Sequence, residues 1–253
     1  MGTGAITQYV DVAQLVLYAF WIFFFGLVYY LVREGHREGY PMETESGRGT
    51  INGWPTPSPK TYLLPGGGEV SYPNDKVSPQ KLMAEPTHAW IGAPLQPINA
   101  NPMLDGIGPG AWADRADVPD LTFHGQPRLQ PLRQQPEFSV HAKNSDPRGL
   151  PVVGADEVVG GTVIDLWVDL SEHQFRYLEV RLVDGSRSVM LPINFARIKA
   201  DVVQVRSIMG RHFGQVPATR REDQITLLEE DKVMGYYGAG TLYADPTRQE
   251  PLV

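Results

Sequence analysis

One short segment of the chain gathers side chains that can exchange protons. Four of them fall within nine residues and an arginine follows: Asp165, Asp169, Glu172, His173 and Arg176. Because alternate positions of a strand share a face, Asp165 and Asp169 are expected to point the same way. Neighbouring carboxylates raise one another's pKa, whereas an arginine lowers it. The segment therefore has two interpretations, a proton relay or a solvated turn with a salt bridge, and the pattern alone favours the turn.

Known enzyme motifs are absent from the sequence. It contains no P-loop, GxSxG, HExxH or dinucleotide-binding glycine pattern after a strand. The glycines at 66–68 precede no helix signal and are predicted to form a tight turn. None of the six histidines pairs with a carboxylate at helical spacing, so we predict no metal site. The lack of cysteine excludes disulfides, thiolate nucleophiles and iron–sulfur ligation.

Composition narrows the class of protein further. The chain has 253 residues, enough for one or two modest domains, and its mean hydropathy of -0.24 indicates that most of it is water-soluble. A formal net charge of -7 argues against a nucleic-acid partner, which would require a basic face.

A membrane-spanning helix is predicted at residues 12–32. This run carries no formal charge and is long enough to cross about 30 Å of hydrocarbon. Tyr29 and Tyr30 lie at its C-terminal end, where an interfacial aromatic belt is expected. A cleaved signal peptide is the alternative, but no Lys or Arg precedes the run and the apolar core is too long.

Charge asymmetry predicts the orientation of this helix. Asp11 precedes it, whereas Arg33, His36 and Arg37 follow it. Since Lys and Arg accumulate on the inner side of a membrane, the N-terminus should be periplasmic and the body of the chain cytoplasmic. Tyr29, Arg33 and Arg37, together with Tyr30, are predicted to contact lipid.

The amino-acid composition of the remaining chain changes along its length. Sixteen of the 22 prolines lie between residues 41 and 136, which predicts extended chain and turns, ordered by recurring aromatic residues against a partner's surface. From about residue 147, β-branched runs predict several short strands, with an Asp-Gly hairpin at 183–186, in a small antiparallel barrel or sandwich. A short helix is predicted from an N-cap at Asp223 to about Gly235.

Several long stretches resemble the H subunit of the photosynthetic reaction centre of purple bacteria. They occur in the same order along nearly the whole chain: DVAQLVLYAFWIFFFGLVYYLVRE, REGYP, PKTYLLPGGG, DPRGLPVVG, DLWVDLSEHQFRYLEV and TLLEEDKVMGYYGAGTLYA. The resemblance implies a membrane-anchored, mainly β fold with one N-terminal transmembrane helix, an irregular surface region, and a small antiparallel β-barrel with a short C-terminal helix. The implied limits are a periplasmic N-terminus at 1–11, the helix at 12–32, a proline-rich membrane-surface region at 33–136 and the barrel domain at 137–253.

The resemblance also implies a function within a larger complex. Such a subunit is not itself an enzyme. It caps the L and M subunits on the cytoplasmic side and helps deliver protons to the secondary quinone. It binds no cofactor alone; bacteriochlorophyll, bacteriopheophytin, quinones, non-haem iron and carotenoid are expected on L and M. Further expected partners are the light-harvesting 1 ring and membrane lipids.

Individual residues inherit roles from this resemblance. Glu172 matches a glutamate close to the quinone-side proton path, and Asp169 and Arg176 match its neighbours. His124 matches one of two histidines at the proton entrance.

The sequence departs from the family at this entrance. Gln126 replaces the second histidine and Thr122 replaces a nearby aspartate, so we expect a different entrance and no divalent-metal site there. Asp117 and Asp120 match other acids of that surface and would compensate.

A second hypothesis remains open beside the subunit. A membrane-tethered barrel protein that serves as an assembly factor or adaptor would share the general architecture. The match within the transmembrane helix and its REGYP junction favours the subunit, since an adaptor would need only some hydrophobic anchor.

Overall fold

A computed structural model describes residues 4, 11–40, 42–43, 50–51, 56–65, 67–74, 82–90 and 93–249. The chain forms two compact units, Met1–Val77 with Ala89–Ala93, and Ser78–His88 with Pro94–Val253. Each unit is considered by itself. Most of the predicted periplasmic segment, and Pro41 of the REGYP junction, lie outside the described residues.

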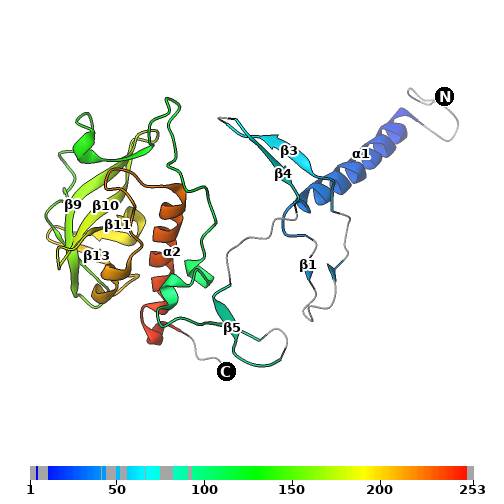
Figure 1. The fold of residues 1–253 in the computed structure, drawn as a ribbon. Coiled ribbons are helices and arrows are strands. Elements are labelled where there is room, and N and C mark those ends of the chain that lie inside the picture. The colour runs from blue at the N-terminus through cyan, green and yellow to red at the C-terminus, as the bar shows by residue number, and fades with distance from the viewer. Residues whose placement is uncertain are drawn as a thin grey trace. The chain divides into compact units, whose positions relative to one another are not determined.

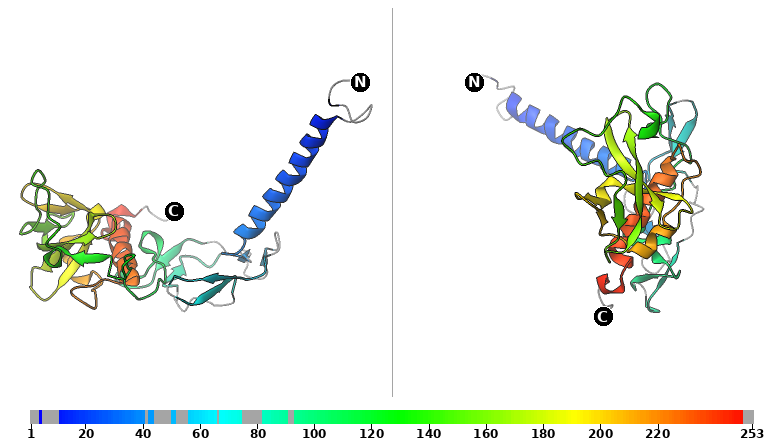
Figure 2. Two further views of the ribbon diagram at one scale, coloured as in Figure 1. Left: turned by 90° about the horizontal axis from the view of Figure 1, so that it is seen from above. Right: turned by 90° about the vertical axis from the view of Figure 1, so that its left-hand side faces the viewer.

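One long helix, α1 (Val12–Gly35), dominates the first unit (Figures 1 and 2). Asp11 caps it, because its carboxylate accepts a hydrogen bond of 2.7 Å from the backbone N–H of Gln14. No residue of α1 is buried within the described chain, and the helix is long and apolar enough to cross a membrane. The predicted helix is confirmed, and it continues beyond residue 32 to Gly35.

A hairpin follows α1 in the same unit. Strands β3 (Lys60–Leu63) and β4 (Glu69–Tyr72) pair antiparallel. The turn between them is closed by a hydrogen bond of 3.0 Å from Leu64 N to Gly68 O. Gly67 and Gly68 have φ angles of 92° and 114°, which only glycine adopts readily. The described part of the glycine run is thus a tight turn, as predicted.

Arg37 connects the end of α1 to this hairpin. Its Nε atom lies 2.8 Å from an oxygen of Glu34, and its Nη1 donates to the backbone carbonyls of Ser58 and Tyr72 at 2.7 and 3.2 Å. Glu34 also binds Lys60 at 2.5 Å. Only 10% of the Arg37 side chain is exposed. Its guanidinium, which was predicted to contact lipid, is bound by groups of the protein.

The described part of the proline-rich region consists of short strands and turns, as its composition predicts. Its other described elements are two-stranded ladders and single 3₁₀ turns: β1 (Met42–Glu43) with β2 (Thr50–Ile51), β5 (Ala84–Pro86) with β6 (Leu95–Pro97), η1 (Pro102–Leu104) and η2 (Gly108–Gly110).

A curled seven-stranded sheet forms the centre of the second unit (Figure 1). Its order is β11-β10-β9-β8-β13-β12, with β7 also paired to β9, and only the β13–β8 pair is parallel. Strand β7 belongs to this sheet although it lies before residue 137, the predicted start of the barrel. The strands are β7 (Leu129–Pro131), β8 (Pro151–Val153), β9 (Val159–Asp169), β10 (Gln174–Leu182), β11 (Ser188–Pro192), β12 (Ala196–Ile198) and β13 (Val203–Val205).

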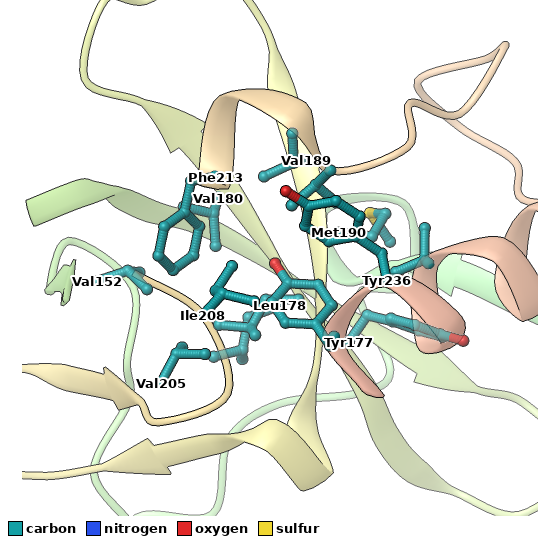
Figure 3. Close-up of a cluster of buried hydrophobic side chains, with 14 of the residues drawn as sticks. Val152, Tyr177, Leu178, Val180, Val189, Met190, Val205, Ile208, Phe213 and Tyr236 are labelled. Carbon is teal, nitrogen blue, oxygen red and sulfur yellow. The ribbon is translucent and has the colours of Figure 1, made fainter. Parts of the chain in front are cut away.

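A cluster of buried hydrophobic side chains packs against this sheet (Figure 3). Leu178 and Val180 of β10 are fully buried beside Ile208, Phe213 and the aromatic ring of Tyr236. Beyond these strands, 3₁₀ turns complete the unit: η3 (Leu132–Gln134), η4 (Ile193–Phe195), η5 (Gly210–Gln215) and η6 (Pro246–Arg248). The hairpin predicted at 183–186 joins β10 to β11, with Gly185 at a φ of 68°.

The C-terminal helix, α2 (Leu227–Tyr243), starts later and extends further than predicted. Thr226 is the N-cap and forms a capping box with Glu229, whereas the carboxylate of Asp223 binds Arg221 at 3.0 Å. The helix continues past Gly235 because this glycine and its neighbours pack against η2, so tertiary contact outweighs their low helix propensity.

Candidate functional site

The predicted acidic cluster is divided between two arginines in the structure. Asp165 and Asp169 are both buried on β9. Arg133 Nη1 binds Asp165 at 2.9 Å and Glu179 at 2.5 Å, so these two carboxylates form a cluster of their own. Asp169 lies opposite Leu129 of β7, beside Arg128. Asp165 and Asp169 therefore bind different cations, because Arg128 precedes β7 whereas Arg133 lies in the turn that follows it.

Arg128 is the centre of the second cluster. Its Nε lies 2.9 Å from both carboxylate oxygens of Asp169, and its Nη1 lies 3.3 Å from Asp120. Its Nη2 donates to Glu172. We call Asp120, Arg128, Asp169, Glu172 and Arg176 the acid–arginine network. Sequence reasoning missed Arg128, because it lies 41 residues before Asp169 and only the strand pairing reveals their contact.

Asp169 is the fixed anion of this network. Only 2% of its surface is exposed, and burial by itself raises its pKa. Hydrogen bonds from Arg128 and from the backbone N–H groups of Glu172 and Ser171 outweigh burial and hold the pKa below its usual value. Asp169 therefore stays ionised at neutral pH and positions the turn that carries Glu172.

Glu172 is the accessible carboxylate of the network. Its side chain is 47% exposed and binds Arg176 at 3.6 Å as well as Arg128. The adjoining His173 adopts a φ of 53°, and its backbone N–H donates to Asp169 O at 2.8 Å. The segment is thus a salt-bridged turn, as its pattern favoured, and this turn presents Glu172 to the surroundings.

A cavity of about 470 Å³ adjoins the network. Asp120, Arg128, Asp169 and Arg176 line it together with Glu230 from the first turn of α2. Its mixture of carboxylates and guanidiniums makes it polar on one side, so it can hold water and exchangeable protons.

Glu230 is a second carboxylate that sequence reasoning missed. Burial raises its pKa, although a hydrogen bond of 2.9 Å from the Tyr177 hydroxyl partly opposes this rise. Burial likewise raises the pKa of Tyr177, so the phenol remains protonated. The cavity thus contains carboxyl groups whose pKa values are shifted in opposite directions, an arrangement found where protons are exchanged. The sequence signal that could have indicated Glu230 is an acidic residue in the first turn of a predicted helix.

His124 lies at the exposed tip of a loop that ends at Arg128. Thr122 and Gln126, the two departures from the family pattern, close this loop through hydrogen bonds of 2.8 Å from Thr122 N to Gln126 O and 3.3 Å from Gln126 N to Thr122 Oγ1. The base of the loop is a hydrogen bond of 2.8 Å from Arg128 N to Asp120 O. The loop therefore links His124 to the network through the backbone.

Asp117 lies apart from the network. It accepts a hydrogen bond of 2.8 Å from the Thr226 hydroxyl and forms an ion pair with Arg220, at the N-terminus of α2. Within the described ranges, no three His, Asp or Glu side chains converge as a metal site would require.

Fold and site together define a class of protein. One apolar N-terminal helix, a curled and largely antiparallel sheet, and a short C-terminal helix describe a membrane-anchored PRC-barrel protein. A family model for the PRC-barrel domain matches residues 141–211. A second model, for the N-terminal region of the photosynthetic reaction centre H-chain, matches residues 4–134, more than half of the chain. The chain therefore belongs to the H-chain family of the photosynthetic reaction centre, which confirms the resemblance found in its sequence and implies association with other reaction-centre subunits.

Proposed function

We propose that this chain caps the L and M subunits of a reaction centre on the cytoplasmic side and helps deliver protons to the secondary quinone. It stabilises the complex without catalysing a reaction itself. The alternative of an assembly factor is less well supported, because the H-chain match covers the helix and the proline-rich region as well as their junction. An adaptor would not require an H-chain-like sequence in these parts.

The exposed aromatic surface of α1, the membrane anchor, supports this assignment. Large aromatic side chains of α1, including Trp21 and Phe23, are exposed in the isolated chain. In the complex they pack beside helices of L and M and beside lipid, with the N-terminus periplasmic. Tyr29, Tyr30 and Arg33 lie at the cytoplasmic interface. L and M hold the bacteriochlorophyll, bacteriopheophytin, quinones, non-haem iron and carotenoid, and the light-harvesting 1 ring surrounds the complex.

One observation carries the proposal of proton delivery. The polar cavity is lined by Asp169, whose pKa is lowered, and by Glu230, whose pKa is raised. The exposed Glu172 binds Arg128 and Arg176, which also line the cavity. Reduction of a quinone to quinol takes up two protons, so a site shielded from water needs titratable side chains that hold and release them. Glu172 exchanges protons, Asp169 and Arg176 position it, and His124 and Asp120 collect protons from solvent.

Replacement of Glu172 tests this route directly. Glu172→Gln keeps the size of the side chain and one acceptor oxygen but cannot carry a proton. In the assembled complex, we expect the second electron transfer to quinone to slow about tenfold or more, because a positioned acid typically accelerates proton transfer by at least this factor. Flash spectroscopy across pH measures the rate. The same assay on Glu230→Gln measures the contribution of the second carboxylate.

Glu137→Gln is the matched control, because Glu137 is an exposed glutamate outside the network. It should leave the rate unchanged. If Glu172→Gln also leaves both the rate and its pH dependence unchanged, Glu172 is not on the proton route.

A further inference from the structure

A second pocket lies on the outer face of β12 and β13, with a volume of about 520 Å³. Arg197 and Gln204 are directly opposite each other in the ladder between these strands and therefore share a face. Val203 and Val205 are fully buried, so Gln204, which alternates with them, points away from the core. We call this hollow the arginine pocket, because Arg206 and Arg248 also line it.

The arginine pocket concentrates positive charge on an acidic protein. Among the described residues, no carboxylate lines it, although the chain carries a formal net charge of -7. The side chains of Arg197 and Arg206 form no ion pair or hydrogen bond with any described residue. Asp245, a nearby carboxylate, is instead bonded to the backbone N–H and hydroxyl of Thr247, both at 2.9 Å. Two guanidiniums are thus left free to bind an anion.

Arg248 is held rigidly in this pocket. Its Nη1 donates to the carbonyls of Ser207 at 2.7 Å and Gly240 at 2.6 Å, and its Nη2 donates to the carbonyl of Arg206 at 3.0 Å. Carbonyl oxygens satisfy its donors without neutralising its charge. Arg248 therefore places a fixed positive charge beside the two free guanidiniums.

Two polar atoms at the pocket lack partners in the structure. Ser207 is only 5% exposed, yet its hydroxyl oxygen has no hydrogen bond. The Oε1 atom of Gln204 is buried and equally unpaired. Buried polar groups are normally hydrogen-bonded, so an orphaned donor and an orphaned acceptor together suggest a ligand that has both an anionic oxygen and a hydroxyl.

We propose that the arginine pocket binds the phosphate ester of a small polyol such as a glycerol phosphate. Its phosphate oxygens accept hydrogen bonds from Arg197, Arg206 and the Ser207 hydroxyl, because guanidiniums match the geometry of phosphate. A hydroxyl of the polyol donates to Gln204 Oε1, and Phe195 also lines the pocket. The pocket volume lies within the range of small-molecule sites. Either a soluble metabolite or the headgroup of a glycerophospholipid carries this chemistry.

The test uses the purified complex in detergent and native mass spectrometry. One series adds glycerol 3-phosphate and another adds inorganic phosphate. Two further series add short-chain phosphatidylglycerol or phosphatidylcholine, which separate a lipid source from a soluble one. The variant Arg197→Gln/Arg206→Gln removes both free guanidiniums. The control Arg181→Gln/Arg221→Gln removes two exposed arginines that do not line the pocket.

We expect one saturable equivalent of glycerol 3-phosphate or of phosphatidylglycerol, with tighter binding than inorganic phosphate. The pocket variant should bind at least tenfold more weakly, whereas the control variant should bind like the wild type. If the pocket variant loses binding of glycerol 3-phosphate, the ligand is a soluble metabolite. If it loses binding of phosphatidylglycerol alone, the ligand is a lipid headgroup. No saturable binding, or equal binding by the pocket variant, would overturn the proposal. Because the assay measures binding without illumination, its outcome is independent of proton delivery.

Discussion

At the scale of residues, the acid–arginine network shows how a protein can keep one carboxylate fixed and another accessible. Asp169 receives hydrogen bonds from Arg128 and from two backbone N–H groups, so its negative charge is stabilised although it is buried. Glu172 shares Arg128 but lies half in solvent. Asp169 therefore stabilises the turn, whereas Glu172 is the carboxylate that we propose exchanges protons.

Asp169→Asn should destabilise the second unit by about 2 kcal/mol, the usual magnitude for charge-assisted hydrogen bonds. Because the folded-state pKa of Asp169 is lowered, its stabilisation is present above the unfolded value of about 3.9 and is lost as the pH falls through the folded pKa. The difference between wild type and variant should shrink on acidification. Denaturant unfolding of the full chain in detergent measures this, with the exposed Asp201→Asn as control. A difference that does not depend on pH would contradict this role.

At the scale of elements, small residues determine how α2 packs in the second unit. A Cβ atom on Gly238 would lie 2.4 Å from Pro109 O, and one on Gly235 would lie 2.8 Å from Gly110 O. The helix and the η2 turn are therefore close enough for backbone to touch backbone. This contact holds the middle of α2 against η2, and the first turn of the same helix carries Glu230, which lines the cavity.

Gly238→Ala should lower the free energy of unfolding by about 1–3 kcal/mol through overpacking. This is opposite to the gain of about 1 kcal/mol expected from helix propensity alone. Gly214→Ala is a suitable control, because a Cβ there meets nothing within 4 Å. Denaturant titration followed by circular dichroism compares the two variants. A Gly238→Ala protein as stable as the wild type would show that the contact is not tight.

At the scale of the whole molecule, local patterns predicted the elements better than the contacts between them. The uncharged run predicted α1, and Asp-Gly predicted the β10–β11 hairpin, because both signals are contained within a few neighbouring residues. The role of Arg128 was hidden, because β7 is three residues long and pairs with a strand far along the chain. Glu230 was missed for the same reason, since its environment depends on how α2 packs.

Co-isolation tests most directly whether this chain is a permanent subunit of a reaction centre, as we propose. The tagged chain is purified in mild detergent from cells that synthesise bacteriochlorophyll. We expect it to be recovered with L and M in equal amounts, together with pigment that absorbs in the near infrared. A correctly folded, membrane-bound chain recovered without pigment would contradict the assignment and favour an adaptor.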